Sequence, residues 1–209
     1  GSAENGRFIG AVSPVERMIF VNRSGERFVA EDSPSSRLSE AVLAQPGGIA
    51  FPILDADGCA DMRTLSRAMF ERALMRGDAF EADSIPELAS HLQIPAEALQ
   101  ATIKAYNQAV ETRQDPLGRS AGVLMHRIAR RPFYGAKVTM CVNCTLGGIA
   151  ITPRAEVLDR RGRIIPGLLA AGEITGNVHG ENRIGGNGIA DAVTFGRIAG
   201  QTALETPRR

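Results

Sequence analysis

The sequence predicts a mixed α+β chain that divides near residue 136, and three features of its pattern support this. Short apolar runs bounded by turn residues open the chain, and capped helical segments follow from about residue 64. From Lys137 onward, glycine-rich loops alternate with short apolar runs, and residues 159–162 predict a hairpin turn. A last helix, rich in Ala and Gly, is expected over residues 187–204 and should pack closely against a sheet. We therefore expect one domain over residues 1–136 and a second segment over residues 137–209.

The opening part predicts short strands. Residues 18–22 indicate a strand, residues 24–25 a turn, and residues 27–29 a return strand. An apolar run over residues 49–54 follows Gly47-Gly48 and predicts a buried strand, because a polar Asp55 ends it.

Three helices are expected next, each with a recognisable end. The first covers about residues 64–76, because Gly77 is a good C-cap. The second begins at Ser84, where Glu87 completes a capping box. The third starts after Ile94, and apolar residues at helical spacing predict its buried face: Leu99, Ile103, Tyr106 and Val110.

Composition excludes several classes of partner. The formal net charge of +1 gives no reason to expect nucleic acid or an anionic membrane. No apolar run approaches the ~20 residues that span a bilayer. Three cysteines do not make a disulfide framework, so we expect a reducing compartment such as the cytoplasm, with the periplasm left open. We predict no nucleic acid and no membrane as partner.

The stretch from residue 171 to residue 191 carries the candidate chemistry. Gly185-Gly186 let the backbone approach a bound group, and Asn187 can cap the following helix. The positive helix end favours an anion or an electron-rich carbonyl, which would face the N–H groups of Gly188, Ile189 and Ala190. His179 and Arg183 add a donor and a cation. On spacing alone, a glycine-rich helix start with a solvated histidine and arginine is an equal alternative.

Taken whole, the stretch resembles the C-terminal signature of the fumarate reductase/succinate dehydrogenase flavoproteins. Gly172-Glu173, His179-Gly180 and the Asn-Arg-Ile-Gly-Gly-Asn of residues 182–187 occupy its places. Further matches are a Thr-Leu-Gly-Gly at residues 145–148, a Pro-Gly-Leu-Leu-Ala-Ala-Gly-Glu at residues 166–173, and a Val-Asn-x-x-Gly-x-Arg-Phe-x-x-Glu at residues 21–31. The resemblance covers nearly all of residues 18–204.

The resemblance implies a fold and a reaction. Residues 1–136 would form the family's substrate-capping domain, and residues 137–209 would add strands and a helix of an incomplete FAD-binding domain. The reaction would be hydride transfer between flavin N5 and a carbon, coupled to proton transfer at the neighbouring carbon. This makes or breaks a C–C double bond next to a carboxylate or carbonyl of a small carboxylate or ketone substrate.

Site residues follow from the same resemblance. Arg183 would clamp a substrate carboxylate, since a guanidinium can bind it bidentately, and would act with Arg37 in catalysis. The other substrate contacts would be Cys144, Thr145 and His179. FAD would contact Gly172, Glu173, Gly186, Asn187, Gly188 and Ile189.

Two departures concern the substrate. Cys144 occupies the place of a family histidine that binds a carboxylate. Ungapped counting puts Ser35 where the family has its catalytic arginine, and Arg37 lies two residues beyond, so Arg37 is either the catalytic acid or a solvated arginine. Both departures argue against fumarate itself. They favour a tricarballylate dehydrogenase-like or ketosteroid dehydrogenase-like relative, and residues 43–48 lean toward the former.

A third departure concerns the cofactor. The family's Gly-x-Gly-x-x-Gly fingerprint, which holds the ADP half of FAD, does not occur in these 209 residues. We therefore expect a truncated chain that lacks the N-terminal FAD-binding half, binds FAD weakly or not at all, and is inactive alone. Half a domain exposes apolar surface, so a homo-oligomer through that surface is also expected.

Two other readings stay open. Cys141 and Cys144 form a Cys-x-x-Cys, which elsewhere indicates a dithiol or half a zinc site. A structural zinc needs about four ligands, and the other candidate ligands are distant in the sequence: Cys59, His91, His126 and His179. The motif also leads into a strand, whereas a redox Cys-x-x-Cys opens a helix. We therefore predict no metal. The second alternative is that the protein is a non-catalytic interaction module, which keeps the fold without its cofactor.

Overall fold

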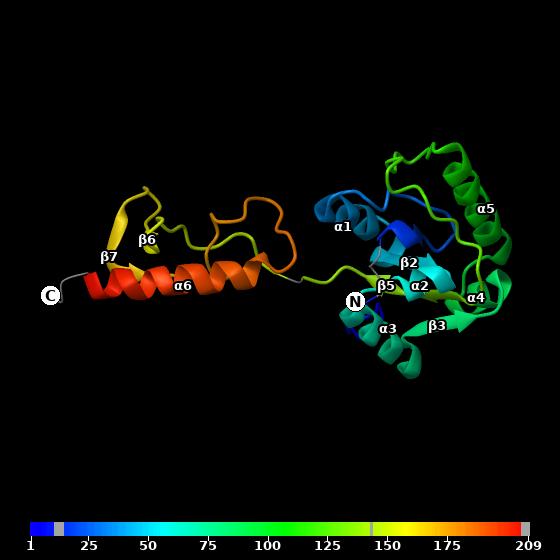
Figure 1. Ribbon diagram of the computed structural model, residues 1–209, viewed down its shortest axis with the longest axis horizontal. Helices are drawn as coiled ribbons and strands as arrows, with labels where there is room; N and C mark the ends of the chain where they lie inside the picture. Colours follow the sequence, from blue (N-terminus) through cyan, green and yellow to red (C-terminus); the bar gives the residue numbers. More distant parts are fainter. Residues whose placement is uncertain (11–14, 143, 206–209) are drawn as a thin grey trace. The chain divides into compact units, whose positions relative to one another are not determined.

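The computed structural model describes residues 1–10, 15–142 and 144–205, and confirms a mixed α+β fold (Figure 1). The chain forms two compact units, Gly1–Cys141 and Val142–Arg209, here called unit 1 and unit 2. Residues 137–141 group with unit 1 because β5 (Val138–Thr139) pairs with a strand of that unit. None of the helices in the described ranges is long and apolar enough to cross a membrane.

Unit 1 is built around an antiparallel sheet. Its strands lie in the order β1 (Met18–Val21), β2 (Ile49–Leu54), β4 (Phe133–Ala136) and β3 (Ala79–Ala82), and β5 pairs with β2. The strand predicted over residues 49–54 is β2, and every neighbouring pair is antiparallel.

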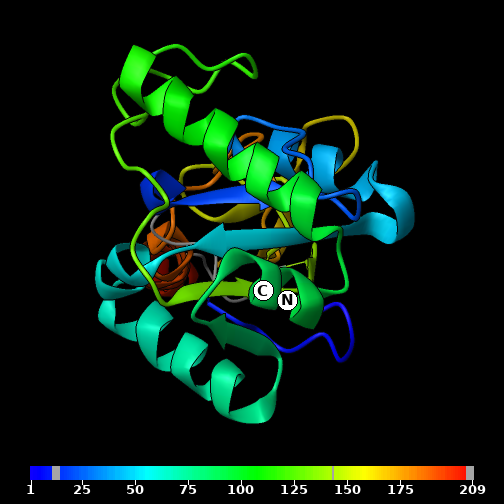
Figure 2. The ribbon, with the colours of Figure 1, turned by 90° about the vertical axis from the view of Figure 1, so that its right-hand side faces the viewer.

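Helices cover both faces of this sheet (Figure 2). Ile19 and Val21 point to one face, where they pack against α4 (Ile85–Leu92) and α5 (Ala96–Thr112). Met18 and Phe20 point to the other face, where they pack against α1 (Ser35–Leu43) and α3 (Thr64–Arg76). Because successive side chains of a strand alternate between faces, all four residues of β1 are buried. The remaining short helices are η1 (Val15–Arg17), η2 (Pro46–Gly48) and α2 (Ala56–Ala60).

The predicted helix ends in unit 1 are confirmed. α3 ends at Gly77, which adopts a left-handed φ of 75°. The Ser84 hydroxyl accepts a hydrogen bond from the Glu87 N–H at 3.3 Å, and the Glu87 carboxylate accepts one from the Asp83 N–H at 3.0 Å. The four residues predicted for the buried face of α5 are all buried.

Two segments differ from the sequence-based prediction. The return strand expected over residues 27–29 is reduced to a single bridge between Val21 and Arg27. Arg27 and Glu31 in this segment instead form a buried polar network. In addition, neither α1 nor β3 was predicted from the sequence.

The polar network lies inside unit 1. Arg27 forms ion pairs of 2.7 Å with both Glu31 and Asp115, and Arg119 lies 3.2 Å from Glu31. Both guanidinium groups lie over the Tyr106 ring, at 5.0 and 5.4 Å from its centroid. Burial lowers the pKa of Arg27, but the hydrogen bonds and charges of the two carboxylates outweigh it and leave that pKa above its ordinary value. The network therefore ties residues far apart in sequence into one core.

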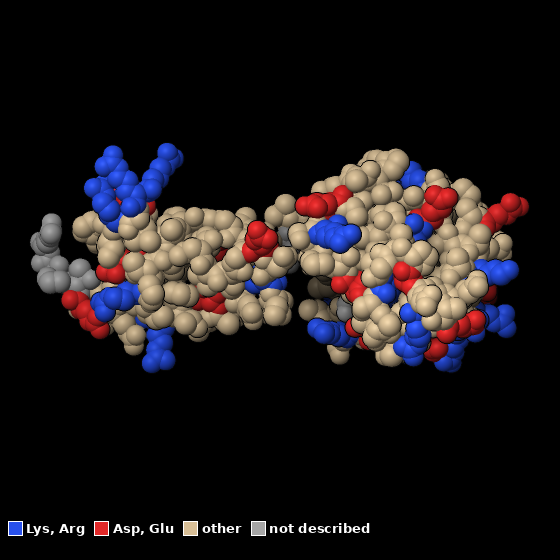
Figure 3. Space-filling model, turned by 90° about the horizontal axis from the view of Figure 1, so that it is seen from above, with Lys and Arg blue, Asp and Glu red and all other residues tan. Residues whose placement is uncertain are grey.

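Unit 2 contains a hairpin and one long helix. β6 (Glu156–Leu158) and β7 (Ile164–Leu169) form the hairpin predicted around residues 159–162, with Gly162 at a φ of 74°. Asp159 holds the turn, because its carboxylate accepts hydrogen bonds from the Arg161 and Arg163 N–H groups. In the space-filling view, arginine side chains gather over this hairpin (Figure 3); the exposed ones are Arg160, Arg161 and Arg163.

The last helix, α6 (Asn187–Glu205), matches the prediction in its bounds but not in its packing. The sequence predicted close packing against a sheet. In the structure only Asp191 and Thr202 of this helix are buried. The reason is that the sheet formed by the described residues of unit 2 has two strands, β6 and β7, and so offers the helix little surface. The run at residues 149–151 adds isolated bridges, from Ile149 to Thr175 and from Ile151 to Val157.

Candidate functional site

Two glycines let two loops of unit 2 cross at backbone distance. A Cβ on Gly148 would collide with the Ile174 carbonyl oxygen, and a Cβ on Gly176 would collide with the Gly148 backbone. The crossing is fixed by hydrogen bonds from the Ile149 N–H to the Ile174 carbonyl at 2.8 Å and from the Gly176 N–H to the Ile149 carbonyl at 3.1 Å. Only glycine permits this approach.

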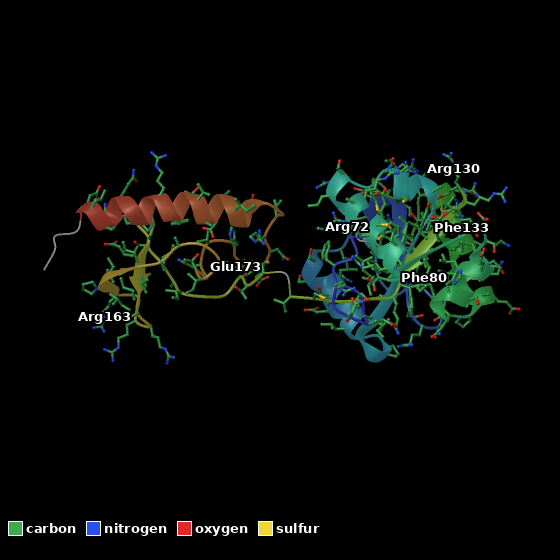
Figure 4. All side chains as sticks on the ribbon, turned by 90° about the horizontal axis from the view of Figure 1, so that it is seen from below. Arg72, Phe80, Arg130, Phe133, Arg163 and Glu173 are labelled. Atoms are coloured by element: carbon green, nitrogen blue, oxygen red, sulfur yellow. The ribbon has the colours of Figure 1, made fainter. Side chains whose placement is uncertain are left out.

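The crossing brings two of the predicted site residues together. The Thr145 N–H donates to the Glu173 carboxylate at 3.0 Å, and the Thr145 hydroxyl donates to the Glu173 carbonyl at 3.4 Å. Gly172, directly before Glu173, has a φ of 81°. Its carbonyl accepts a 2.8 Å hydrogen bond from the Thr175 hydroxyl. Figure 4 shows Glu173 in this loop region, away from Arg163 at the hairpin.

The start of α6 forms the other side of the site. Gly186 has a φ of 92°, and nothing lies within 4 Å of the position that a Cβ would occupy there. The Ile189 N–H, expected to be free, donates to the Gly186 carbonyl at 3.1 Å. The first turn of α6 and the Gly172–Thr175 segment border a pocket of about 550 Å³, lined by Glu173, Arg183, Gly186, Gly188, Ile189, Ala192 and Val193.

Arg183 lies at this pocket, over Gly188. A Cβ on Gly188 would come within 2.8 Å of a terminal nitrogen of the Arg183 guanidinium. The nearby Cys144 side chain, followed by the charges of Glu173 and Asp191, raises the pKa of Arg183 above its ordinary value. The structure thus brings together Cys144, Glu173 and Arg183.

His179 faces α6 rather than open solvent. Its Nε2 atom lies 3.4 Å from the Asp191 carboxylate, and the side chains of His179 and Asp191 are 17% and 3% exposed. Asp191, Ala192 and Val193 were missed by the sequence-based prediction. The available signal was that Asp191 is the only charged residue in the first ten of α6.

The remaining predicted residues lie elsewhere. Arg37 is on α1 in unit 1, exposed and without an ion pair among the residues that the structure describes. Cys141 belongs to unit 1 and Cys144 to unit 2, while Asn143 of the Cys-x-x-Cys lies outside the described residues. Across residues 1–10, 15–142 and 144–205, no three histidine, cysteine or acidic side chains are grouped as metal ligands.

Comparison with known proteins gives a consistent result. The family described as FAD binding domain matches residues 4–189. NADH:acrylate oxidoreductase of Vibrio harveyi is 38% identical over 207 residues, which are 98% of this chain and 20% of that protein. Fumarate reductase (cytochrome) of Shewanella frigidimarina is 38% identical over 191 residues, 91% of this chain and 32% of that protein. The open conformation of a flavocytochrome c3 fumarate reductase has a TM-score of 0.67 at 35% identity, covering 96% of this chain and 34% of that chain.

The chain therefore belongs to the FAD-binding family of fumarate reductase flavoproteins. The prediction of this family, and of FAD as the cofactor of its members, is confirmed. The chain spans between a fifth and about a third of the length of these relatives.

Proposed function

We propose that this chain supplies the substrate-binding and flavin-facing part of an FAD-dependent oxidoreductase that reduces or forms a C–C double bond beside a carboxylate or carbonyl. The observation that carries the proposal is the pocket at the start of α6. An arginine, a glutamate and a glycine-rich helix start converge there in one unit. The positive end of a helix favours a group that gains negative charge.

The residues at this pocket fit a flavin. Gly186 leaves room for a flat ring, because nothing lies within 4 Å of the position that its Cβ would occupy, and the pocket lies at the positive, N-terminal end of α6. We propose that Gly172, Glu173, Gly186, Asn187, Gly188 and Ile189 hold the cofactor. FAD, when bound, supplies hydride exchange at its N5 atom.

The substrate contacts come from the same pocket. We propose that Arg183 binds a substrate carboxylate bidentately, because its guanidinium is partly exposed at the pocket wall. Cys144, Thr145 and His179 would complete the contacts. Cys144 offers no permanent cation for a second carboxylate, which supports a substrate other than fumarate. The named relatives act on acrylate and fumarate, so a small carboxylate is the substrate class that we propose.

Arg37 stays our candidate for the group that protonates the neighbouring carbon. Its exposure on α1 is compatible with either a catalytic or a solvated arginine. Arg37→Gln in the complete protein should remove turnover but leave flavin absorbance unchanged. Turnover at the wild-type rate would assign the proton to another group.

Arg183→Ala in the complete protein is the direct test of the proposed function. We expect kcat/KM for a small carboxylate to fall roughly a hundredfold or more, because a preorganised charged contact is lost. Flavin absorbance should remain. Arg183→Lys should recover only part of the activity, since lysine cannot bind bidentately. Arg160→Ala on the exposed hairpin is the matched control and should be silent. Unchanged turnover in Arg183→Ala would refute the substrate assignment.

A second candidate, a non-catalytic interaction module, is favoured by the exposed apolar side chains of unit 2. Large ones are Ile174, Ile184, Ile189, Val193 and Leu204. We propose instead that the rest of the FAD-binding domain covers them, because the relatives are three to five times longer. A colourless complete protein would favour the module. Sedimentation of this chain tests whether a second copy takes that place, and a single monomer boundary would argue against it.

A further inference from the structure

Asp191 has no role in the function proposed above, yet it is a buried charged residue on α6, directly before the pocket-lining Ala192 and Val193. Its side chain is 3% exposed, early in a helix that is otherwise largely exposed. A buried carboxylate without a partner costs several kcal/mol. Asp191 therefore needs a cationic or donating partner to remain in this position.

The partner that the structure provides is His179. The Nε2 atom of His179 lies 3.4 Å from one carboxylate oxygen of Asp191, which is longer than an ordinary hydrogen bond. Nε2 of His179 and Oδ1 of Asp191 are both buried and have no hydrogen-bond partner among the described residues. A small shift of the imidazole would convert this contact into a charge-assisted hydrogen bond.

His179 belongs to the loop that carries Arg183. At the start of this loop, the Asn177 side chain accepts from the Ile151 N–H at 3.0 Å and donates to the Ile151 carbonyl at 2.9 Å. At its end, the Asn187 N–H donates to the Ile184 carbonyl at 3.2 Å. Between these two anchors, the contact from His179 to Asp191 links the loop to α6.

We propose that Asp191 is a positioning residue, which through His179 holds the loop over residues 178–186 against α6 and so keeps the Arg183 guanidinium above Gly188. The effect of Asp191 on catalysis rests on the proposed function, because that function assigns binding of the substrate carboxylate to Arg183. The holding of the loop does not depend on it. The two statements can therefore fail separately.

The first test measures the loop in the 209-residue chain. Trypsin cleaves after Arg183, and mass spectrometry can follow that cut together with amide hydrogen exchange over residues 178–186. We expect Asp191→Asn and His179→Leu to accelerate both about tenfold. His179→Gln keeps a donor near the position of Nε2 and should stay close to wild type. Asp159→Asn, in the hairpin turn, is the control and should leave the loop unchanged.

The outcomes of this first test are distinct. Equal protection in wild type, Asp191→Asn and His179→Leu would overturn the proposal. Loss of protection in His179→Gln as large as in His179→Leu would also overturn it, because a donor at that position would then not matter. Rescue by glutamine supports it, since a merely space-filling role would not distinguish the two variants.

The second test uses the complete protein. Asp191→Asn should raise KM for a small carboxylate about tenfold, with a smaller effect on kcat and with flavin absorbance unchanged. If Arg183→Ala is silent but the loop loosens in Asp191→Asn, the proposed function fails and the loop contact stands. If Arg183→Ala removes turnover but Asp191→Asn leaves KM unchanged, Asp191 does not position Arg183.

Discussion

Unit 1 and unit 2 bury their apolar side chains to very different extents. Of the buried hydrophobic residues that the structure describes, thirty lie in unit 1 and three, Ile151, Ala155 and Val157, lie in unit 2. Unit 1 has two hydrophobic clusters on opposite faces of its sheet, and unit 2 has neither. The larger unit is stabilised by side-chain packing, whereas the smaller one depends on backbone contacts and leaves much of α6 exposed.

This difference shows where each unit is sensitive to mutation. In unit 1, stability depends on side chains that fill space or satisfy charge, so large-to-small and charge-removing changes should matter. In unit 2, the crossing at Gly148 and Gly176 leaves no room for a side chain at all. Glycine substitutions should therefore be the most damaging changes there.

The largest effect is expected from Gly148→Ala. The added methyl group would collide with the Ile174 carbonyl, and backbone cannot move aside without breaking the hydrogen bonds of the crossing. We expect unit 2 to lose more than about 3 kcal/mol and to unfold. Amide signals of unit 2 should collapse in NMR spectra while those of unit 1 remain.

Gly147→Ala is the control for this prediction, because nothing lies within 4 Å of a Cβ at that position. It should leave both units folded. A folded unit 2 in Gly148→Ala would contradict the view that this crossing holds it together.

Part of the fold of unit 1 was predictable from the sequence, and the features that were missed have physical reasons. Caps and helical spacing located α3, α4 and α5, because those signals are local. The buried network was not predictable, since Arg119 lies 88 residues from Glu31. β3 was missed because it is four residues long and half of it is not buried.

The candidate site shows the same limit. Its glycines and Arg183 lie in one contiguous stretch, so their shared motif indicated them together. The proximity of Arg183 to Cys144 and the contact of His179 with Asp191 depend on how the loop folds back. A single aspartate in a helix of small residues gave no periodic signal for its burial.

The second largest effect is expected from Glu31→Gln in unit 1. Glu31 accepts hydrogen bonds from Arg27, Arg119 and the Phe20 N–H, and its side chain is 0% exposed. Removing its charge leaves two buried guanidinium groups with one carboxylate, Asp115. We expect a loss of about 3 kcal/mol in the free energy of unfolding, measured by urea denaturation.

The control for Glu31→Gln is Asp57→Asn. Asp57 pairs with Arg130 at 2.7 Å, but the two side chains are 43% and 72% exposed. Exposed pairs contribute less than about 1 kcal/mol. Similar losses in the two variants would mean that burial does not set the strength of the network.

A smaller effect is expected at alkaline pH, again in unit 1. Burial, followed by the neighbouring Cys59 and Glu81, raises the pKa of Tyr134 to about 12. An unfolded tyrosine titrates near about 10. The folded state therefore favours the neutral phenol, and this contribution to stability is complete below about pH 10 and lost as pH rises through about 12.

Both tyrosines of the chain lie in unit 1, so phenolate absorbance reports on that unit alone. Tyr134→Phe should remove the upper step of a pH titration, and Tyr106→Phe should keep it. A Tyr134 step near the ordinary value would show that the surroundings of this half-buried side chain do not stabilise the neutral phenol.

The smallest effect on stability is expected from Gly188→Ala in unit 2, which sharpens the contrast with Gly148. At Gly188 the added methyl group meets the end of the flexible Arg183 side chain rather than backbone. Arg183 can move away, and alanine favours the helix by about 1 kcal/mol over glycine. We expect the free energy of unfolding to change by less than about 1 kcal/mol, whereas KM for a small carboxylate rises in the complete protein.

Gly196→Ala on the same helix separates these two effects. Nothing lies within 4 Å of its Cβ position, so it gains helix propensity without displacing Arg183. It should match Gly188→Ala in stability or exceed it, and leave KM unchanged. Because both substitutions add one methyl group to α6, a KM increase confined to Gly188→Ala follows from the guanidinium position and not from the helix. Equal KM values in the two variants would place the functional contact of Arg183 away from Gly188.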